Sequence, residues 1–230
     1  MTSVTAEQAL NVVEFRADDR PSTRSPSYGE DPTVLADIYR DDVNIAIWQR
    51  TINGRLNNAL QKFLAASPQF EKLLTVTPDS AHAAVIDGTG GSAPLELADD
   101  VAQLVDIFCY LFDRERAGLR MATLDRAMCP RFHVDRIPCR MITTYSGVAT
   151  EWIPHEAVTY SKPGPGSKRQ SGFGPGLSAD ESEMRRLTSG DVALLKGALW
   201  AGNEDGGLVH RSPAVPHGET RLILSLDFCD

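Results

Sequence analysis

RLILSLDF, residues 221–228, is the stretch of sequence that decides the fold class of this chain. Apolar side chains occupy every second position: Leu222, Leu224, Leu226 and Phe228. Successive side chains of a β-strand point to opposite faces, so this spacing predicts a strand with one apolar face. Arg221 and Ser225 then point the same way on the opposite face. They face either water or the inside of a β-structure that holds a polar ligand.

A similar pattern extends back to about residue 117. Short runs with an apolar residue at every second position are separated there by Gly, Pro, Ser and Asp. Such runs predict strands separated by turns. We expect strands near 118–124, 131–134, 139–145, 150–158, 191–196, 207–210 and 220–228. The segment 161–176 is too rich in Gly and Pro for a central strand, so we interpret it as a long loop and a possible lid.

The first half of the chain has a different pattern. Leu56, Leu60, Phe63 and Leu64 lie on one face of a predicted helix, and apolar residues between 97 and 112 predict a second helix. A short helix near Val34 and a strand at 43–47 precede them. Residues 1–30 are polar and predict a flexible arm. We therefore expect one domain, 31–230, that is mainly helical over 31–116 and all-β over 117–230.

Composition excludes several classes of function. Asp and Glu total 31 against 23 Lys and Arg, a net charge of −8, which disfavours nucleic acid as a partner. The N-terminus lacks a basic and an apolar signal region, and no apolar run is long enough for a membrane span, so we expect a cytoplasmic protein. The four cysteines have no C-x-x-C spacing and are expected to be free thiols.

The segment CPRFHVDR, residues 129–136, holds the candidate chemistry. Alternate residues of an extended chain project to the same side, so His133 and Asp135 can reach one metal ion. Two imidazoles and one carboxylate hold non-haem Fe(II) and leave positions open for oxygen and substrate. His210 is the best third ligand because it ends a short apolar strand, and His217 in a Pro-Gly turn is its rival. Cys129 could instead complete a zinc site with the same three residues.

These residues carry a resemblance. H-x-D, a distant His, and an Arg on the final strand resemble the signature of Fe(II)/2-oxoglutarate-dependent dioxygenases. The resemblance implies that His133, Asp135 and His210 bind iron and that Arg221 binds the distal carboxylate of 2-oxoglutarate. Ser225 and Tyr145 are further candidates for the cosubstrate site. Many members place Ser or Thr two residues after the Arg, whereas this chain has Ile223 there. The chain also resembles an uncharacterised bacterial family of unknown function.

The resemblance implies an α+β fold in which a C-terminal double-stranded β-helix, a cupin-like jelly roll, carries a helical N-terminal segment. It also implies oxidation of an unidentified small-molecule or peptide substrate with Fe(II) and 2-oxoglutarate as cofactors. Two alternatives stay open at this point. The chain could bind or handle zinc without redox turnover, or it could be a catalytically inactive cupin-like binding module.

Overall fold

A computed structural model describes residues 23–66, 69–160, 171–174, 176–203 and 205–229 of the chain. Helices and short 3-10 helices are η2 (Pro32–Tyr39), α1 (Gly54–Ala66), α2 (Pro78–Gly88), α3 (Leu95–Phe112), η3 (His155–Ala157) and η4 (Glu181–Glu183). Strands are β1 (Ser25–Gly29), β2 (Val43–Trp48), β3 (Glu71–Val76), β4 (Ala117–Leu124), β5 (Cys139–Ser146), β6 (Glu151–Ile153), β7 (Val158–Tyr160), β8 (Leu177–Ala179), β9 (Arg185–Arg186), β10 (Val192–Lys196), β11 (Val209–Arg211) and β12 (Arg221–Asp227). The protein is thus a mixed structure with a sheet-rich body.

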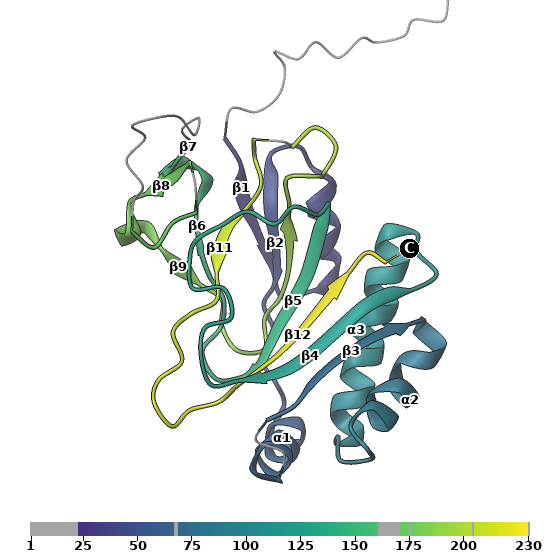
Figure 1. The fold of residues 1–230 in the computed structure, drawn as a ribbon. Coiled ribbons are helices and arrows are strands. Elements are labelled where there is room, and N and C mark those ends of the chain that lie inside the picture. Colours follow the sequence, from purple (N-terminus) through teal and green to yellow (C-terminus); the bar gives the residue numbers. More distant parts are fainter. Residues whose placement is uncertain (1–22, 67–68, 161–170, 175, 204, 230) are drawn as a thin grey trace, which may run out of the picture.

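A seven-stranded sheet forms this body, in the order β1-β2-β10-β5-β12-β4-β3. The final strand β12 lies inside the sheet and pairs antiparallel with both β4 and β5. Its leucines Leu222, Leu224 and Leu226 are buried in the core that also contains apolar residues of α3. Figure 1 shows α2 and α3 side by side next to β3 and β4. The predicted alternation of β12 is confirmed.

The second face of the large sheet carries a smaller sheet, in the order β11-β6-β9. A separate apolar cluster lies between the two sheets, with Ile45 and Ile47 from β2, Leu195 from β10 and Trp152 from β6. Adjacent residues of β2 and β10 point to opposite faces of the sheet. Ala46 and Leu194 therefore lie in the other core, which contains the apolar residues of the helices and is called the helix-side core below. The middle of the large sheet is buried on both faces, which leaves its strands little freedom to shift register.

The helices begin and end where local chemistry requires. Thr77 and Ser80 form a reciprocal capping box at the start of α2, and Pro78 occupies a position where no backbone donor is needed. The helix α3 ends at Asp113, whose φ of 50° is left-handed. Among the residues that the structure describes, no helix is long and apolar enough to cross a membrane.

The structure corrects several expectations about the first half. Part of the predicted arm, Ser25–Gly29, is strand β1, which pairs parallel with β2 at the sheet edge. The strand β3 and the helix α2 were not predicted. Since β1, β2 and β3 all join the large sheet, the mainly helical region and the β region share one sheet. The rest of the predicted arm, 1–22, lies outside the described residues.

The predicted strands of the second half are confirmed for β4, β5, β10, β11 and β12, with small shifts at their ends. The region 150–158 is β6 followed by the 3-10 helix η3 and the start of β7. The region 131–134 forms only isolated bridges, at Phe132 and His133. Most of the predicted loop, 161–170 and 175, lies outside the described residues, and so does its suggested role as a lid.

Candidate metal centre

His133 and His210 face each other across a two-residue antiparallel bridge. The N–H of His133 donates to the carbonyl of His210, and the N–H of His210 donates to the carbonyl of His133, both at 3.0 Å. This reciprocal pairing places their Cβ atoms on the same side of the ladder. The two imidazole centroids are 4.7 Å apart. Two segments 77 residues apart in sequence are thus locked in register at the site.

Both imidazoles are oriented by the backbone. The Nδ1 of His133 lies 2.9 Å from the carbonyl oxygen of Arg131, and the Nδ1 of His210 lies 3.2 Å from that of Leu208. A carbonyl oxygen can only accept, so each Nδ1 carries the proton and each Nε2 keeps its lone pair. Metal-binding histidines are held in this way by the hydrogen bond of their other nitrogen.

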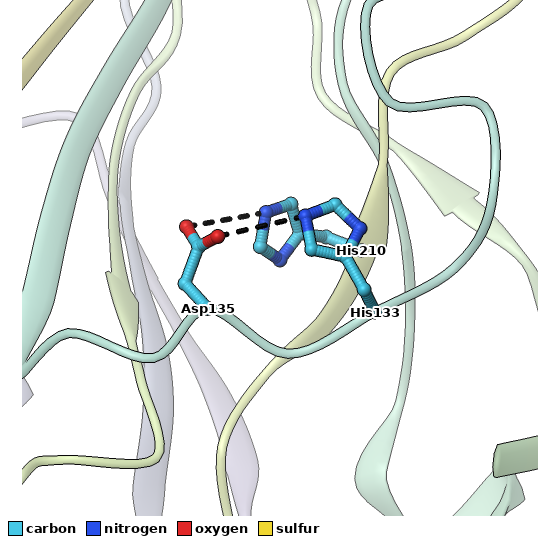
Figure 2. Close-up of side chains that lie close together, drawn as sticks. All are labelled: His133, Asp135 and His210. Carbon is cyan, nitrogen blue, oxygen red and sulfur yellow. Dashed lines mark ion pairs between the residues drawn. The ribbon is translucent and has the colours of Figure 1, made fainter. Parts of the chain in front are cut away.

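Asp135 completes the group (Figure 2). Its Oδ1 lies 3.5 Å from the Nε2 of His133, and its Oδ2 lies 3.6 Å from the Nε2 of His210. Both separations are too long for good hydrogen bonds. One ligand atom from each of the three residues fits within a group no wider than 4.8 Å. The intervening Val134 packs into an apolar cluster on the other side of the segment, as the H-x-D spacing predicts.

The donor set fits a transition metal that prefers mixed nitrogen and oxygen ligands. The Nε2 atoms of His133 and His210 and a carboxylate oxygen of Asp135 lie close together, and one cation would satisfy all three. His133 and His210 line a cavity. Within the described part of the chain, Cys129 lines this cavity too but does not belong to the ligand group. His217, the rival third ligand, is exposed and does not belong to it either.

The protonation states of the candidate ligands at neutral pH also favour metal binding. Burial lowers the pKa of His210 to about 4, which keeps this imidazole neutral at pH 7. Burial alone would raise the pKa of Asp135, but the adjacent His133, His210 and Arg140 lower it to about 2. The Asp135 carboxylate raises the pKa of His133 above its ordinary value. Two of the three ligands are therefore ready to bind a cation at neutral pH.

Arg221 lies at the start of β12 in the wall of the same cavity. Its side chain is buried, with 2% of the residue exposed, and no carboxylate lies within ion-pair distance of it among the described residues. Three hydroxyls accept from its guanidinium at 2.8–3.1 Å, and they belong to Ser212, Thr144 and Thr150. Its Nε has no hydrogen-bond partner within the described part of the chain. Burial lowers the pKa of Arg221 to about 10.

A glycine turn supports this arginine. Gly147, in the segment TTYSGVATEW, has a φ of 83°, which favours glycine. A Cβ at this position would lie 2.8 Å from the carbonyl oxygen of Thr220 and 3.0 Å from the Cα of Arg221. The turn between β5 and β6 can approach the start of β12 only because residue 147 has no side chain.

The two remaining candidates for the cosubstrate site lie apart from Arg221. Ser225 lines the cavity, four residues or about 13 Å further along β12. Tyr145 does not line it: its buried hydroxyl donates to Asp100 of α3 at 2.6 Å, in the helix-side core. The pleat explains this position, because the adjacent Thr144 faces Arg221 and Tyr145 must face the helices. The structure therefore gives Tyr145 a different position from the one expected.

The hydroxyls around Arg221 and the ion pair of Arg140 with Asp135 were not predicted from the sequence. Thr and Ser are too common for their positions to signal a site, and only tertiary contact identifies Thr144, Thr150 and Ser212. Arg140 lines the cavity, where it contacts Asp135. Its position on β5, five residues after the H-x-D carboxylate, is the only signal in the sequence.

Comparison with solved structures finds several chains that are similar to this one. A dioxygenase for auxin oxidation from rice is 11% identical, with a TM-score of 0.48, and the match covers 89% of this chain and 82% of that one. The Arabidopsis thaliana auxin dioxygenase 1, in a binary complex with 2-oxoglutarate, is 8% identical with a TM-score of 0.45 over 89% and 92%. A Pseudomonas putida prolyl-4-hydroxylase is 13% identical with a TM-score of 0.40 over 86% and 97%.

TM-scores below 0.5 at such low identities do not by themselves assign an activity to this chain. No curated protein matches the sequence. A protein family whose description is "protein of unknown function" matches residues 29–227, which is most of the chain. The chain therefore belongs to this family, DUF1826.

Proposed function

We propose that this protein is a mononuclear Fe(II)/2-oxoglutarate-dependent oxygenase with a double-stranded β-helix core. The single observation that carries the proposal is the convergence of His133, Asp135 and His210 beside the cavity that His133 and His210 line together with Arg221. Three convergent ligands alone would also suit zinc, and a buried arginine alone would also suit a structural role. Together they provide one site for a divalent cation and one for an organic anion.

His133, Asp135 and His210 would hold the iron. The two imidazoles and the single carboxylate leave positions free for further ligands, in contrast to a closed structural zinc site. When bound, iron and 2-oxoglutarate supply the activation of O2 that oxidises a substrate. The residues of the chain orient the metal ligands and hold the cosubstrate.

Arg221 would bind the distal carboxylate of 2-oxoglutarate. A buried guanidinium without a carboxylate partner is costly, and an incoming carboxylate would remove that cost. The hydroxyls of Ser212, Thr144 and Thr150 hold the guanidinium in place before the anion arrives. The neighbouring Ile142 and Ile223 give the cavity apolar surface that suits the methylene groups between the two carboxylates.

Spectroscopy under anaerobic conditions tests the proposal without knowledge of the substrate. We expect metal-free protein that receives Fe(II) and then 2-oxoglutarate to develop a weak visible charge-transfer band. His210→Ala should remove the band because iron is lost, and Arg221→Met should weaken it because cosubstrate affinity falls. Arg120→Gln is the matched control, since Arg120 lines the cavity but pairs with Glu71.

Two results would count against the oxygenase. Protein that retains zinc through purification and gives no band with Fe(II) and 2-oxoglutarate would support a metal-handling role without redox turnover. Protein that binds neither metal would support an inactive binding module. In that case His133→Ala would leave every binding property intact.

A further inference from the structure

A three-residue ion network lies directly behind the metal-ligand group. The Nη1 of Arg140 donates to the Oδ2 of Asp135 at 2.9 Å. On its other edge, Nε and Nη2 of the same guanidinium donate to the two oxygens of Asp227 at 2.7 and 3.0 Å. Arg140 therefore joins the candidate metal ligand to a carboxylate of the final strand.

Each oxygen of Asp135 lies near one imidazole, Oδ1 at 3.5 Å from the Nε2 of His133 and Oδ2 at 3.6 Å from the Nε2 of His210. The two oxygens differ in that Oδ2 also accepts a hydrogen bond from the guanidinium of Arg140. A carboxylate with one oxygen occupied by a guanidinium offers the other to a metal. It then acts as a single-atom ligand and occupies one coordination position rather than two.

Asp227 keeps the guanidinium from turning. Asp227 on β12 lies directly opposite Arg140 on β5 in the antiparallel ladder, so the backbone fixes both ends of this pair. The contact uses both oxygens of Asp227 and the planar fork of the arginine, a geometry that a lysine cannot reproduce. The three side chains are only 15–29% exposed, so water competes weakly for these bonds.

We propose that Arg140, anchored by Asp227, is a positioning residue that restricts Asp135 to single-oxygen metal binding and so preserves an open coordination position for 2-oxoglutarate. The inference rests on the proposed function, since it concerns the same metal. The role proposed for Arg140 differs from that of an ordinary stabilising ion pair in what its loss would change. Loss of Arg140 changes what else the metal can bind, rather than only how stable the protein is.

The test uses Co(II) in place of iron, because the ligand-field absorption of Co(II) reports binding without turnover. Co(II) is titrated into metal-free protein, and 2-oxoglutarate is then titrated into the Co(II)-loaded protein. In Arg140→Gln, both oxygens of Asp135 become available to the metal. We expect Co(II) to bind as tightly as in the wild type or more tightly, while the affinity for 2-oxoglutarate falls at least tenfold.

Two further variants separate positioning from charge. Arg120→Gln removes the same charge from the same cavity without touching Asp135, and it should leave the 2-oxoglutarate affinity within about twofold of the wild type. Asp227→Asn makes the cavity more positive but releases the anchor of Arg140. A charge effect alone would tighten 2-oxoglutarate binding in this variant, whereas the proposal expects weaker binding.

The proposal is overturned if Arg140→Gln leaves the 2-oxoglutarate affinity unchanged, or if Co(II) and 2-oxoglutarate affinities fall together. It is also overturned if Arg120→Gln causes an equal loss, or if Asp227→Asn binds 2-oxoglutarate more tightly. Failure of the proposed function looks different: wild-type protein would then bind no Co(II), or would bind Co(II) without any spectral response to 2-oxoglutarate.

Discussion

Replacement of Arg221 by methionine tests whether this arginine binds a ligand or stabilises the fold. Methionine preserves an unbranched apolar stem and removes the charged head. The residue is 2% exposed, so a structural role would make this a severe substitution. Breaking a paired buried charge typically costs about 3–5 kcal/mol. Arg221, however, has no carboxylate partner among the described residues.

The expected change in unfolding free energy follows from two opposing contributions. Burial lowers the pKa of Arg221 to about 10. At about 1.4 kcal/mol per pKa unit, the buried charge costs the folded protein about 3 kcal/mol. The substitution recovers this energy but loses three hydrogen bonds from the charged guanidinium to hydroxyls, each with a net value of about 1.5 kcal/mol, the lower end for a charged donor. The ligand-free variant should therefore unfold within about 1–2 kcal/mol of the wild type.

Ligand binding should respond far more strongly. Two charge-assisted hydrogen bonds from a guanidinium to a carboxylate contribute about 3–6 kcal/mol, so the affinity of the Co(II)-loaded protein for 2-oxoglutarate should fall about 100-fold or more. Urea denaturation of the metal-free proteins measures the change in unfolding free energy. Thermal unfolding with Co(II) and increasing 2-oxoglutarate measures the change in 2-oxoglutarate affinity, because a bound ligand raises the unfolding temperature.

Either of two results would contradict a ligand-binding role for Arg221. A loss of about 3–5 kcal/mol in the metal-free variant would show that the guanidinium has a structural role. An unchanged rise in unfolding temperature with 2-oxoglutarate would show that the cosubstrate does not contact it.

Three further predictions concern other parts of the structure. Gly197→Ala should destabilise the protein by more than about 2 kcal/mol and weaken Co(II) binding, because a Cβ would clash with the carbonyl oxygen of Ile137 and lie 2.8 Å from that of Asp135; denaturation and Co(II) titration measure both effects. Tyr145→Phe should cost about 1 kcal/mol in urea denaturation through loss of the bond to Asp100, with an unchanged 2-oxoglutarate affinity. Glu151→Gln should lower the unfolding free energy by about 1–2 kcal/mol at pH 7, and this difference should shrink as the pH falls below 4.5.

The pH dependence of the last prediction has a definite sign. Burial alone would raise the pKa of Glu151, but hydrogen bonds from Arg186 and Arg211 lower it below its ordinary value of 4.5. A carboxylate with a lowered pKa stabilises the folded state above its unfolded-state pKa, and this contribution is lost as the pH falls. A wild-type advantage over the glutamine variant that persists unchanged at about pH 3 would contradict the assignment.

Matched controls make the other two predictions decisive. Gly54→Ala, at the start of α1, meets no atom of the described residues within 4 Å and should leave stability nearly unchanged. An equal loss in Gly54→Ala and Gly197→Ala would show that the contacts with Ile137 and Asp135 are not the cause. A Tyr145→Phe variant with impaired 2-oxoglutarate binding would show that Tyr145 contributes to the cosubstrate site after all.

The sequence by itself determined the features that depend on local periodicity and on short spacing. The alternation in β12 fixed which residues face the apolar core, because the side-chain period of a strand is two. The H-x-D spacing placed Val134 in an apolar cluster and left His133 and Asp135 together. Helical spacing identified α3 and most of α1.

Only the tertiary structure decided the partners of these residues. Hydrogen bonding to the backbone set the orientation of His133 and His210, and the ladder between β5 and β12 set the pairing of Arg140 with Asp227. The strand β3 escaped prediction because it lies at the sheet edge with Leu73 exposed, so its pattern is weak. Periodicity reports which face of an element is buried, whereas a site needs the register between elements distant in sequence, and that register arises only when the strands pair.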